Sequence, residues 1–535
     1  MADRGEAQGR GPMHVVIAGG GVAGLEALLA LSTLAEGLVD VELVSPSDEF
    51  VYRPLLVAEP FGAAEVLEIE LDRVVGDAGA RHTRDALVSV DPDTCTITTA
   101  SGDTLGYDAL LIALGANPVE AVPGALAFSG ETERRRFAEL LTTLGRRGRK
   151  RLAFVVPRGA AWSIAAYELA LLTAAERDTR RLEGVEITLV THEAAPLDLF
   201  GPAASQLVAA RLEEAGIPAR LSTVVERFDD GELRVVAGES LAVDAAVALP
   251  TLEVPPLPGL PQGENGFVRT DAAMHVVGLE AVWAAGDATW FPVKQGGLAA
   301  QQADVAARSI AAHAGAHIPI EAFEPVLRGA LITGEAPNFL RSSMADGGDA
   351  AAVGRGLWSP PTKVAAKHLG PYVARAIGEE SSQELADLEP SADPAADEAA
   401  HHRAVSLVLA AADADARIGD FEGALKWLSL AERLNLVIPP EYVARRYEWR
   451  RQLQPDLAPE AAAERIDPSF ASAAAAISDL WRRVGWLVEI ERHTEGEMRE
   501  HLSALDEGMD HLIARSRRAG ILEGPTARGP VDPKA

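Results

Sequence analysis

The chain has 535 residues, of which 48% are hydrophobic and 24% are charged, and its formal net charge is −30. This length predicts about three domains, each with its own core. The charge argues against nucleic acid and anionic membrane surfaces as partners, because phosphate groups repel an acidic surface. The one cysteine, Cys95, excludes an intrachain disulfide or redox dithiol and favours a reducing compartment.

The N-terminal residues 1–12 contain no apolar segment of the kind found in signal peptides, so we expect a disordered tail there. No apolar run approaches the ~18 residues typical of a membrane span. We therefore expect a cytoplasmic chain without a span, and peripheral membrane contact is left open.

A glycine motif follows the first apolar run. His14 to Ala18 predicts a buried strand, and Gly19-x-Gly21-x-x-Gly24 leads into residues with helical periodicity. In a dinucleotide-binding turn, Gly19 makes the turn, Gly21 lets the backbone approach a pyrophosphate, and Gly24 allows close packing. The helix start, with Val22 and Ala23, offers free N–H groups. Ser45 ends the second strand, where an acidic residue usually holds the ribose.

Two later segments complete a pattern. Tyr107 to Pro118 predicts a strand ending at Gly115, and residues 281–285 predict another strand, followed by Gly286-Asp287 and a long helix. In this order the motifs resemble FAD oxidoreductases with two dinucleotide-binding domains, the pyridine nucleotide-disulfide oxidoreductase-like proteins. Type II NADH dehydrogenases and sulfide:quinone oxidoreductases are the most similar members.

The resemblance implies that FAD is the cofactor. It implies that Gly19, Gly21 and Gly24 hold the pyrophosphate and that Asp287 bonds the ribityl chain. It also places Gly296, Gly297 and Leu298 near the flavin ring, where the helix N-terminus would stabilise negative charge.

A second strand, turn and helix run from Arg151 to Glu176, but the glycines are mostly replaced. Pro157, Gly159 and Trp162 occupy the three motif positions. Proline removes a donor and fixes φ, and tryptophan fills the place where helix and strand should touch. We therefore predict a domain that keeps the fold and binds NAD(P)H poorly. Tyr167-Glu168 resembles a pair in sulfide:quinone oxidoreductases, but their redox cysteines are missing here.

The segment Leu298 to Ala303 resembles an element at the quinone pocket of type II NADH dehydrogenases. This likeness implies that Gln301 and Gln302 contact a quinone-like acceptor and that Lys294 biases the flavin or its partner. The alternative, that both glutamines only form a polar helix face, stays open.

The C-terminal part departs from these relatives. Residues 381–399 form an acidic linker by composition, and helical periodicity before Pro439-Pro440 predicts a tetratricopeptide-like hairpin that turns at Gly419-Asp420. A seven-residue spacing from Phe470 to Leu512 predicts further long helices. The acid–histidine pairs Glu489/His493, Glu497/His501 and Glu507/His511 are typical of solvated helix surfaces, so no metal site is expected.

The expected fold class is α/β, with two Rossmann-like domains, one nested in the other, plus an all-α extension. The FAD-binding domain comprises 13–120 and 265–318, interrupted by a degenerate NAD(P)-binding-like domain at 121–264. An interface domain at 319–380, the linker at 381–399, a helical domain at 400–520 and a disordered tail at 521–535 follow.

The expected function is an FAD-dependent oxidoreductase that passes electrons from an unidentified small-molecule donor to a quinone-like or protein acceptor. No catalytic side chain is identifiable, so the cofactor would carry the chemistry. Two alternatives remain: a flavin-bound scaffold or redox sensor whose helices recruit a protein partner, and an NAD(P)H dehydrogenase with an unusual cofactor loop.

Overall fold

The computed structural model describes residues 11–64, 66–145, 150–160, 162–178, 182–344, 349–353, 357, 362–376, 394–417, 419–433 and 438–453. The chain divides into two compact units, Met1–Val437 and Ile438–Ala535.

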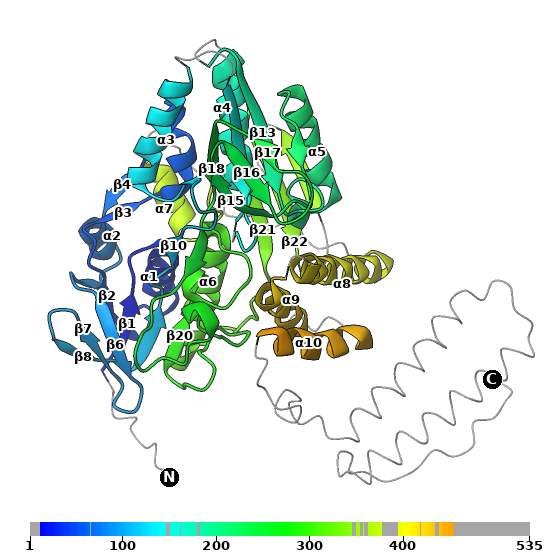
Figure 1. Cartoon of the computed structure of the whole chain (residues 1–535). Helices are drawn as coiled ribbons and strands as arrows, with labels where there is room; N and C mark the ends of the chain where they lie inside the picture. Colours follow the sequence, from blue (N-terminus) through cyan, green and yellow to red (C-terminus); the bar gives the residue numbers. More distant parts are fainter. Residues whose placement is uncertain are drawn as a thin grey trace, which may run out of the picture. The chain divides into compact units, whose positions relative to one another are not determined.

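A five-stranded parallel sheet forms the centre of the first Rossmann-like domain (Figure 1). Residues 15–18 of its middle strand are fully buried, as expected for a parallel strand covered on both faces. Helices α1 (Val22–Leu34) and α6 (Gly296–His313) pack against each other beside this sheet. The strands, in spatial order, are β20 (Val282–Ala284), β9 (Ala109–Ile112), β1 (Met13–Ala18), β2 (Val39–Val44) and β5 (Arg81–Thr83).

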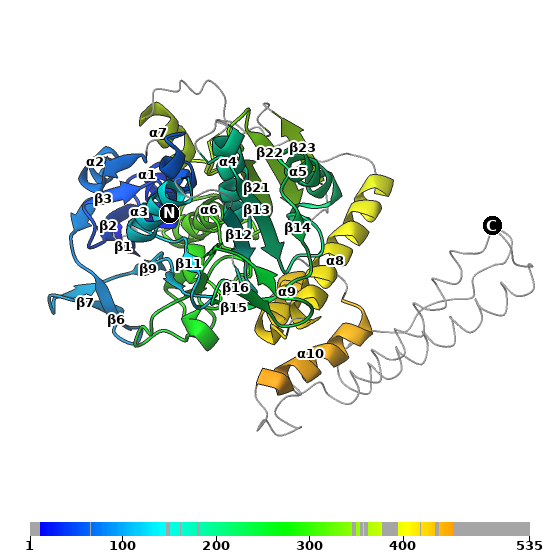
Figure 2. The same ribbon diagram turned by 45° about the horizontal axis from the view of Figure 1, so that its top comes forward.

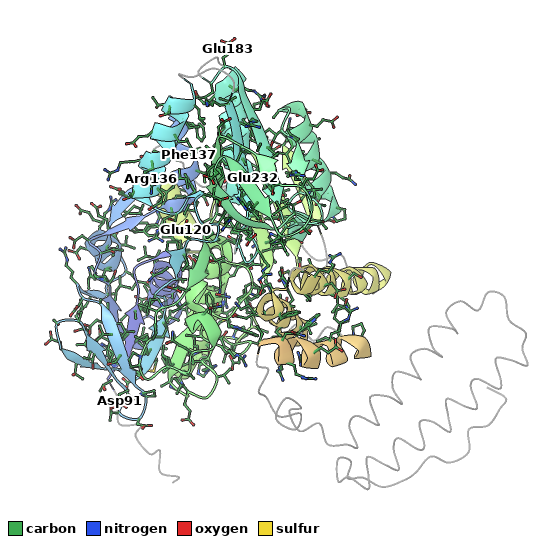
Figure 3. The ribbon with its side chains drawn as sticks, viewed as in Figure 1. Asp91, Glu120, Arg136, Phe137, Glu183 and Glu232 are labelled. Atoms are coloured by element: carbon green, nitrogen blue, oxygen red, sulfur yellow. The ribbon has the colours of Figure 1, made fainter. Side chains whose placement is uncertain are left out.

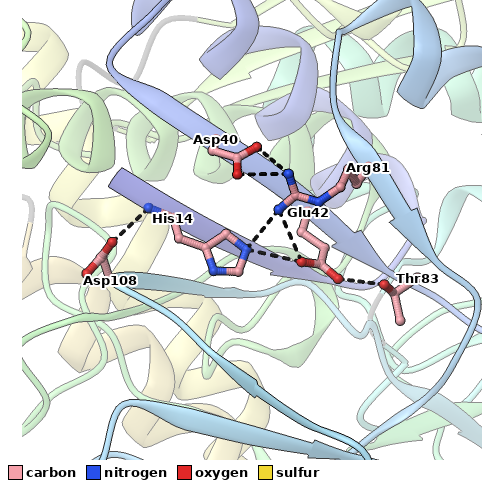
Figure 4. A network of polar contacts seen from close by, with 6 residues as sticks. All are labelled: His14, Asp40, Glu42, Arg81, Thr83 and Asp108. Atoms are coloured by element: carbon pink, nitrogen blue, oxygen red, sulfur yellow. Dashed lines mark hydrogen bonds and ion pairs between the residues drawn. The ribbon is translucent and has the colours of Figure 1, made fainter. Parts of the chain in front are cut away.

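A polar network joins neighbouring strands of this sheet (Figure 4). Arg81 on β5 makes two bonds of 2.7 and 2.8 Å to Asp40 on β2, and His14 on β1 lies 3.1 Å from Glu42. Burial disfavours the charge of Glu42, but hydrogen bonds with Thr83 and His14 outweigh it and lower the pKa. The network links β1, β2 and β5 through His14, near the start of β1, whereas the glycine turn follows the other end of this strand.

The first domain also contains short strands and helices outside its central sheet. They are β3 (Glu49–Val51) paired with β4 (Glu68–Glu70), the sheet of β6 (Leu87–Asp91), β7 (Thr96–Thr99) and β8 (Thr104–Gly106), helix α2 (Leu71–Asp77), and the 3-10 helices η1 (Arg53–Val57), η2 (Glu59–Phe61), η4 (Glu264–Gly266) and η5 (Gly286–Ala288). Cys95 lies half-buried in the β6–β7 turn with φ of 50°.

The second Rossmann-like domain is nested in the first. Its parallel sheet has the order β11 (Leu126–Ala127), β18 (Ala245–Ala248), β12 (Lys150–Val156), β13 (Val185–Thr191), β14 (Ala219–Arg220). Its other elements are α3 (Glu131–Leu144), α4 (Ile164–Asp178), η3 (Asp198–Phe200), α5 (Pro202–Glu214), β15 (Val225–Asp229), β16 (Glu232–Val235) and β17 (Leu241–Ala242). Phe137 of α3 (Figure 3) is fully buried, with edge-on ring contacts to Phe61, Phe128 and Phe154 at 5.6–6.0 Å.

Two antiparallel strands form the ribbon between the two domains. β10 (Asn117–Val119) leads into the nested domain and β19 (Thr251–Glu253) leads out, paired residue by residue. The chain therefore enters and leaves the insert at one place.

The segment after α6 folds back onto both domains. It contains the antiparallel strands β21 (Val326–Leu331), β22 (Asn338–Ser343) and β23 (Asp349–Val353), and helix α7 (Leu369–Ala376). Glu26 of α1, fully buried, accepts hydrogen bonds from the backbone N–H groups of Lys367, His368 and Leu369 at 2.6–3.2 Å. These bonds satisfy donors that the start of α7 would otherwise leave unpaired.

Helices α8 (Pro394–Arg417) and α9 (Phe421–Arg433) form the predicted hairpin, turning at Gly419-Asp420, and lie side by side in Figures 1 and 2. α8 begins at Pro394, inside the stretch predicted as a linker, because proline is favoured in the first helical turn and the alanines that follow are strong helix formers. Trp427 donates a 2.8 Å bond to Asp415 across the pair.

Helix α10 (Pro440–Leu453) belongs to the second unit, and within it the rings of Tyr442 and Trp449 lie 6.4 Å apart. The seven-residue spacing, the three acid–histidine pairs and the C-terminal tail lie outside the described residues. Within the described ranges, no helix is both long and apolar enough to cross a membrane.

Candidate functional site

The first glycine turn connects β1 to α1. Gly19 has φ of 117°, and a Cβ there would overlap the carbonyl of Ala113. A Cβ on Gly24 would overlap the carbonyl oxygen of Gly19. Gly21, the N-cap of α1, has an ordinary φ of −86°, and a Cβ there would meet nothing within 4 Å. Two glycines thus serve packing, while the third borders open space at the helix start, as a phosphate cradle requires.

The strands beside this turn supply its borders. Ser45, at the end of β2, is 3% exposed, and its hydroxyl lies 3.4 Å from the backbone nitrogen of Ser47. Its Oγ also lies only 2.9 Å from where a Cβ on Gly20 would be. Gly115, after β9, has φ of 72° and open space around its Cβ direction. Val22 and Ala23 occupy the first turn of α1.

A carboxyl group lies at the C-terminal end of β20. Gly286 has φ of 79°, and its Cβ direction points at Ala23, so this turn packs directly against the first motif. Asp287 follows it and is partly exposed. Burial raises the pKa of Asp287, and the positive charges of Lys294 and Arg53 oppose that rise. A carboxyl with this surrounding can accept hydrogen bonds from hydroxyl groups of a ligand.

Helix α6 begins beside this carboxyl. Gln295 caps the helix, its side-chain oxygen accepting from the backbone N–H of Gly297. A Cβ on Gly296 would lie 2.7 Å from a methyl of Val364, so the backbone here is held close to the segment before α7. Leu298 is 1% exposed. The start of α6 is therefore fixed by packing from two directions.

Both glutamines of the predicted acceptor element are used inside the fold. Gln302, 2% exposed, accepts a 2.8 Å bond from the N–H of Gly286. Gln301 pairs with the backbone of Val326 on β21 through bonds of 2.9 and 3.0 Å. These bonds tie α6 to the Asp287 turn and to β21, and the contact of Gln301 and Gln302 with an acceptor stays a prediction.

Lys294 is buried and bonds the carbonyl of Thr289, with its ammonium 4.3 Å from the centre of the Phe267 ring. It also lines a cavity of about 500 Å³.

The second nucleotide cleft has the predicted departures. The turn after β12 contains Gly159 with φ of 73°. Trp162 stacks edge-on against Phe200 with ring centres 5.3 Å apart. A cavity of about 500 Å³ lies here, bordered by the turn, by residues 192–200, by Lys294 and by helices α8 and α9. Its wall on one side is thus the C-terminal hairpin.

Carboxyl groups gather around this cavity. Glu193 is 6% exposed and accepts from the hydroxyls of Tyr167 at 2.6 Å and Thr191 at 2.7 Å. Burial, reinforced by Asp198, raises the pKa of Glu193 to about 7. Burial and the neighbouring Asp420 raise the pKa of Asp415 to about 8. The same cavity is also bordered by the cationic side chains Arg158, Lys294, Arg417 and Lys426.

A buried ion pair borders a second, smaller cavity of about 250 Å³ near Gly296. Glu168 of α4 accepts from Lys363 at 2.7 Å and from the N–H of Ile332 at 2.9 Å, and Lys363 also donates to the carbonyl of Pro54. Burial raises the pKa of Glu168 and lowers that of Lys363, while each charge favours the other. Sequence reasoning noted Glu168 but not this partner, because 195 residues separate the two.

In the described part of the chain, no group of three or more His, Cys, Asp or Glu residues could hold a metal ion.

Comparison with known proteins agrees with this fold. An NADH dehydrogenase-like protein of Mycobacterium tuberculosis is 28% identical over 298 residues, which cover 51% of this chain and 72% of that protein. A sulfide-quinone reductase of Aquifex aeolicus is 31% identical over 113 residues, 21% of this chain and 26% of the relative. The crystal structure of the sulfide:quinone oxidoreductase from Aquifex aeolicus matches with a TM-score of 0.59 at 18% identity, covering 71% of this chain and 100% of that chain.

A family model described as pyridine nucleotide-disulphide oxidoreductase matches residues 13–309, more than half of the chain. The match includes both glycine-turn regions and the Asp287 turn, and it confirms the resemblance inferred from the sequence. The chain belongs to the pyridine nucleotide-disulphide oxidoreductase family.

Proposed function

We propose that this chain is an FAD-dependent oxidoreductase that passes electrons from a donor other than free NAD(P)H to a quinone-like or protein acceptor. The observation that carries the proposal is the open space before Gly21, at the N-terminus of α1 and beside the partly exposed Asp287. Backbone N–H groups suited to a pyrophosphate thus lie near a carboxyl group suited to hydroxyl groups, because the Gly286 turn packs against Ala23.

Bound FAD would supply the electron-transfer chemistry. The chain's own residues would bind and orient it: Gly21, Val22 and Ala23 at the pyrophosphate, Ser45 and Gly115 at the borders, and Asp287 at the ribityl hydroxyls. Gly297 and Leu298 begin α6, whose N-terminus would favour negative charge in front of it. These assignments support the proposal because Gly19, Gly24 and Gly286 are packed too tightly to accept other side chains without rearrangement.

The choice of acceptor rests on the relatives. One is named a sulfide-quinone reductase and another an NADH dehydrogenase-like protein. A quinone-like acceptor fits the first name, whereas the second cleft here argues against NADH as donor. Lys294, a residue of our predicted acceptor set, borders the cavity of about 500 Å³. We infer that it acts electrostatically, because its ammonium already bonds Thr289.

The test begins with the purified full chain. Its cofactor is released by heat and identified by chromatography, and its visible spectrum is followed anaerobically. We expect FAD near one per chain, no rapid bleaching by NADH or NADPH, and reoxidation of the photoreduced protein by a soluble quinone. A chain purified without flavin that takes up none on titration with FAD would refute the proposal.

A second candidate is an FAD-bound redox sensor or scaffold whose helices recruit a protein partner. It is favoured by the hairpin α8–α9, which covers the second cleft. The same experiment separates the two functions, because a sensor would bind FAD but would not be reoxidised by quinone faster than free flavin.

A further inference from the structure

The C-terminal hairpin is attached to the nested domain and its surroundings by specific polar contacts. Asn265 donates a 2.7 Å hydrogen bond to Glu422 of α9. The ammonium of Lys426, one turn further on, lies 4.5 Å from the centre of the Phe267 ring and 3.0 Å from Glu422. These contacts fix α9 at the mouth of the second nucleotide cleft.

The tip of the hairpin meets the turn that replaced the second glycine motif. Gly419 has φ of +78°, and a Cβ there would lie 3.2 Å from a guanidinium nitrogen of Arg158. From the other side, a Cβ on Gly159 would lie 3.8 Å from a carboxylate oxygen of Asp420. The two turns, 157–160 and 419–420, are therefore in van der Waals range, although more than 250 residues separate them.

The carboxylate of Asp420 is held in this position by its own helix. One oxygen accepts a 2.9 Å bond from the N–H of Gly423, the usual cap of a helix N-terminus. The other oxygen lies 3.8 Å from the position that a Cβ on Gly159 would take. In a dinucleotide-binding fold, this strand-to-helix turn is where the pyrophosphate binds. A negatively charged group of the chain itself thus lies where a negatively charged group of the ligand would lie.

We propose that the α8–α9 hairpin is a built-in occupant of the second nucleotide cleft, and that it competes with a dinucleotide for the turn at Arg158 and Gly159. With the hairpin docked, the Asp420 carboxylate and the hairpin tip exclude a pyrophosphate. When the hairpin moves away, Arg158 and the backbone of the turn become accessible to one. The hairpin therefore controls which ligands enter the second cleft, whatever the electron donor is.

The charged groups near Asp420 support the proposal that the hairpin competes with a dinucleotide and does not only fill the cavity. His192 lies within electrostatic range of Asp420 and Arg158. Asp415 lies within electrostatic range of Asp420 and Asp198. Burial raises the pKa of Asp415 to about 8, and the charges of Asp420 and Asp198 add to this rise, so ionisation of Asp415 opposes docking of the hairpin.

The experiment measures NADH binding to the full chain by calorimetry, independently of flavin reduction. Gly419→Trp should push the tip from Arg158. The milder double variant Asn265→Ala/Lys426→Ala removes two attachments by shortening two side chains that border the cavity, while the turn at Arg158 and Gly159 is left unchanged. Ser429→Ala on α9 is the control. Amide hydrogen exchange of residues 421–433 reports whether each variant has loosened the hairpin, and extracted FAD shows that the first site is intact.

We expect no measurable NADH binding by the unchanged chain and the control. We expect at least a tenfold gain in affinity in the loosened variants, reversed when Arg158→Glu is added. Faster exchange without a gain in NADH affinity would overturn the proposal, because the turn sequence alone would then exclude the dinucleotide. NADH binding by the unchanged chain with α9 still protected would overturn it as well. Neither result depends on FAD content, so the proposed function would fail or stand separately.

Discussion

Substitution of Gly21 is expected to weaken cofactor binding, whereas substitution of Gly24 is expected to lower the stability of the fold. A side chain on Gly21 would project into open space, whereas a Cβ on Gly24 would lie 1.8 Å from the carbonyl oxygen of Gly19. Gly21→Val should therefore leave the fold intact and block the cofactor. Gly24→Ala should strain the contact between α1 and the turn.

The magnitudes follow from these surroundings. At Gly21 the backbone has ordinary φ and ψ, so the cost is that of a poor N-cap, about 1 kcal/mol or less. At Gly24 the backbone must shift, and overpacking of this kind costs roughly 1–3 kcal/mol. For FAD, loss of the pyrophosphate approach in Gly21→Val should weaken binding by a factor of ~100, about 2.7 kcal/mol.

The assay separates folding from binding. Cofactor-free protein is prepared from both variants, urea unfolding is followed by circular dichroism, and FAD is then titrated back with flavin fluorescence as the signal. Removing the cofactor first matters because a bound ligand itself stabilises the folded state. Wild-type FAD affinity in Gly21→Val, or unchanged unfolding of cofactor-free Gly24→Ala, would refute the reasoning.

Three further outcomes are expected. Glu26→Ala should lower the free energy of unfolding by about 3–5 kcal/mol, because it leaves buried N–H donors unpaired; urea unfolding checks this, and a loss below about 1 kcal/mol would contradict it. Glu168→Ala should cost a similar ~3–5 kcal/mol by leaving Lys363 buried without its partner, and Glu168→Gln/Lys363→Met should recover much of that loss in the same measurement. Asp415 keeps its proton in the folded state up to about pH 8, so hairpin docking should weaken as pH rises from about 4 to about 8. Amide exchange of 421–433, corrected for intrinsic rates, should show this trend, and Asp415→Asn should remove it.

Local sequence was sufficient where a residue's role depends on its immediate neighbours. The glycine motif at 19–24 and the nested second domain could be predicted, since both rest on strand, turn and helix patterns. The hairpin turn at Gly419-Asp420 was predicted correctly for the same reason, although the start of α8 at Pro394 was not. The tetratricopeptide likeness of this hairpin stays a prediction.

Long-range pairing could not be predicted. In the sequence, Glu26 is an ordinary helix residue. Its hydrogen bonds to the backbone N–H groups at the start of α7 are visible only in the folded chain. The bonds of Gln301 to β21 and of Gln302 to the Asp287 turn have no signal in the local sequence, while the acceptor contact inferred for both from family likeness stays a prediction. Nothing in the periodicity of α9 indicates that Asp420 meets Gly159, because a helix pattern defines an apolar stripe but not the surface that covers it.

The ribbon of β10 and β19 has a consequence for how this architecture can be modified. Because the strands pair directly, the two ends of the segment between Val119 and Thr251 are neighbours. Among the described residues, no strand of the nested domain pairs with the first sheet. The insert thus behaves topologically as a loop grown to domain size, which can be exchanged, shortened or rebuilt while the strand order of its host is preserved.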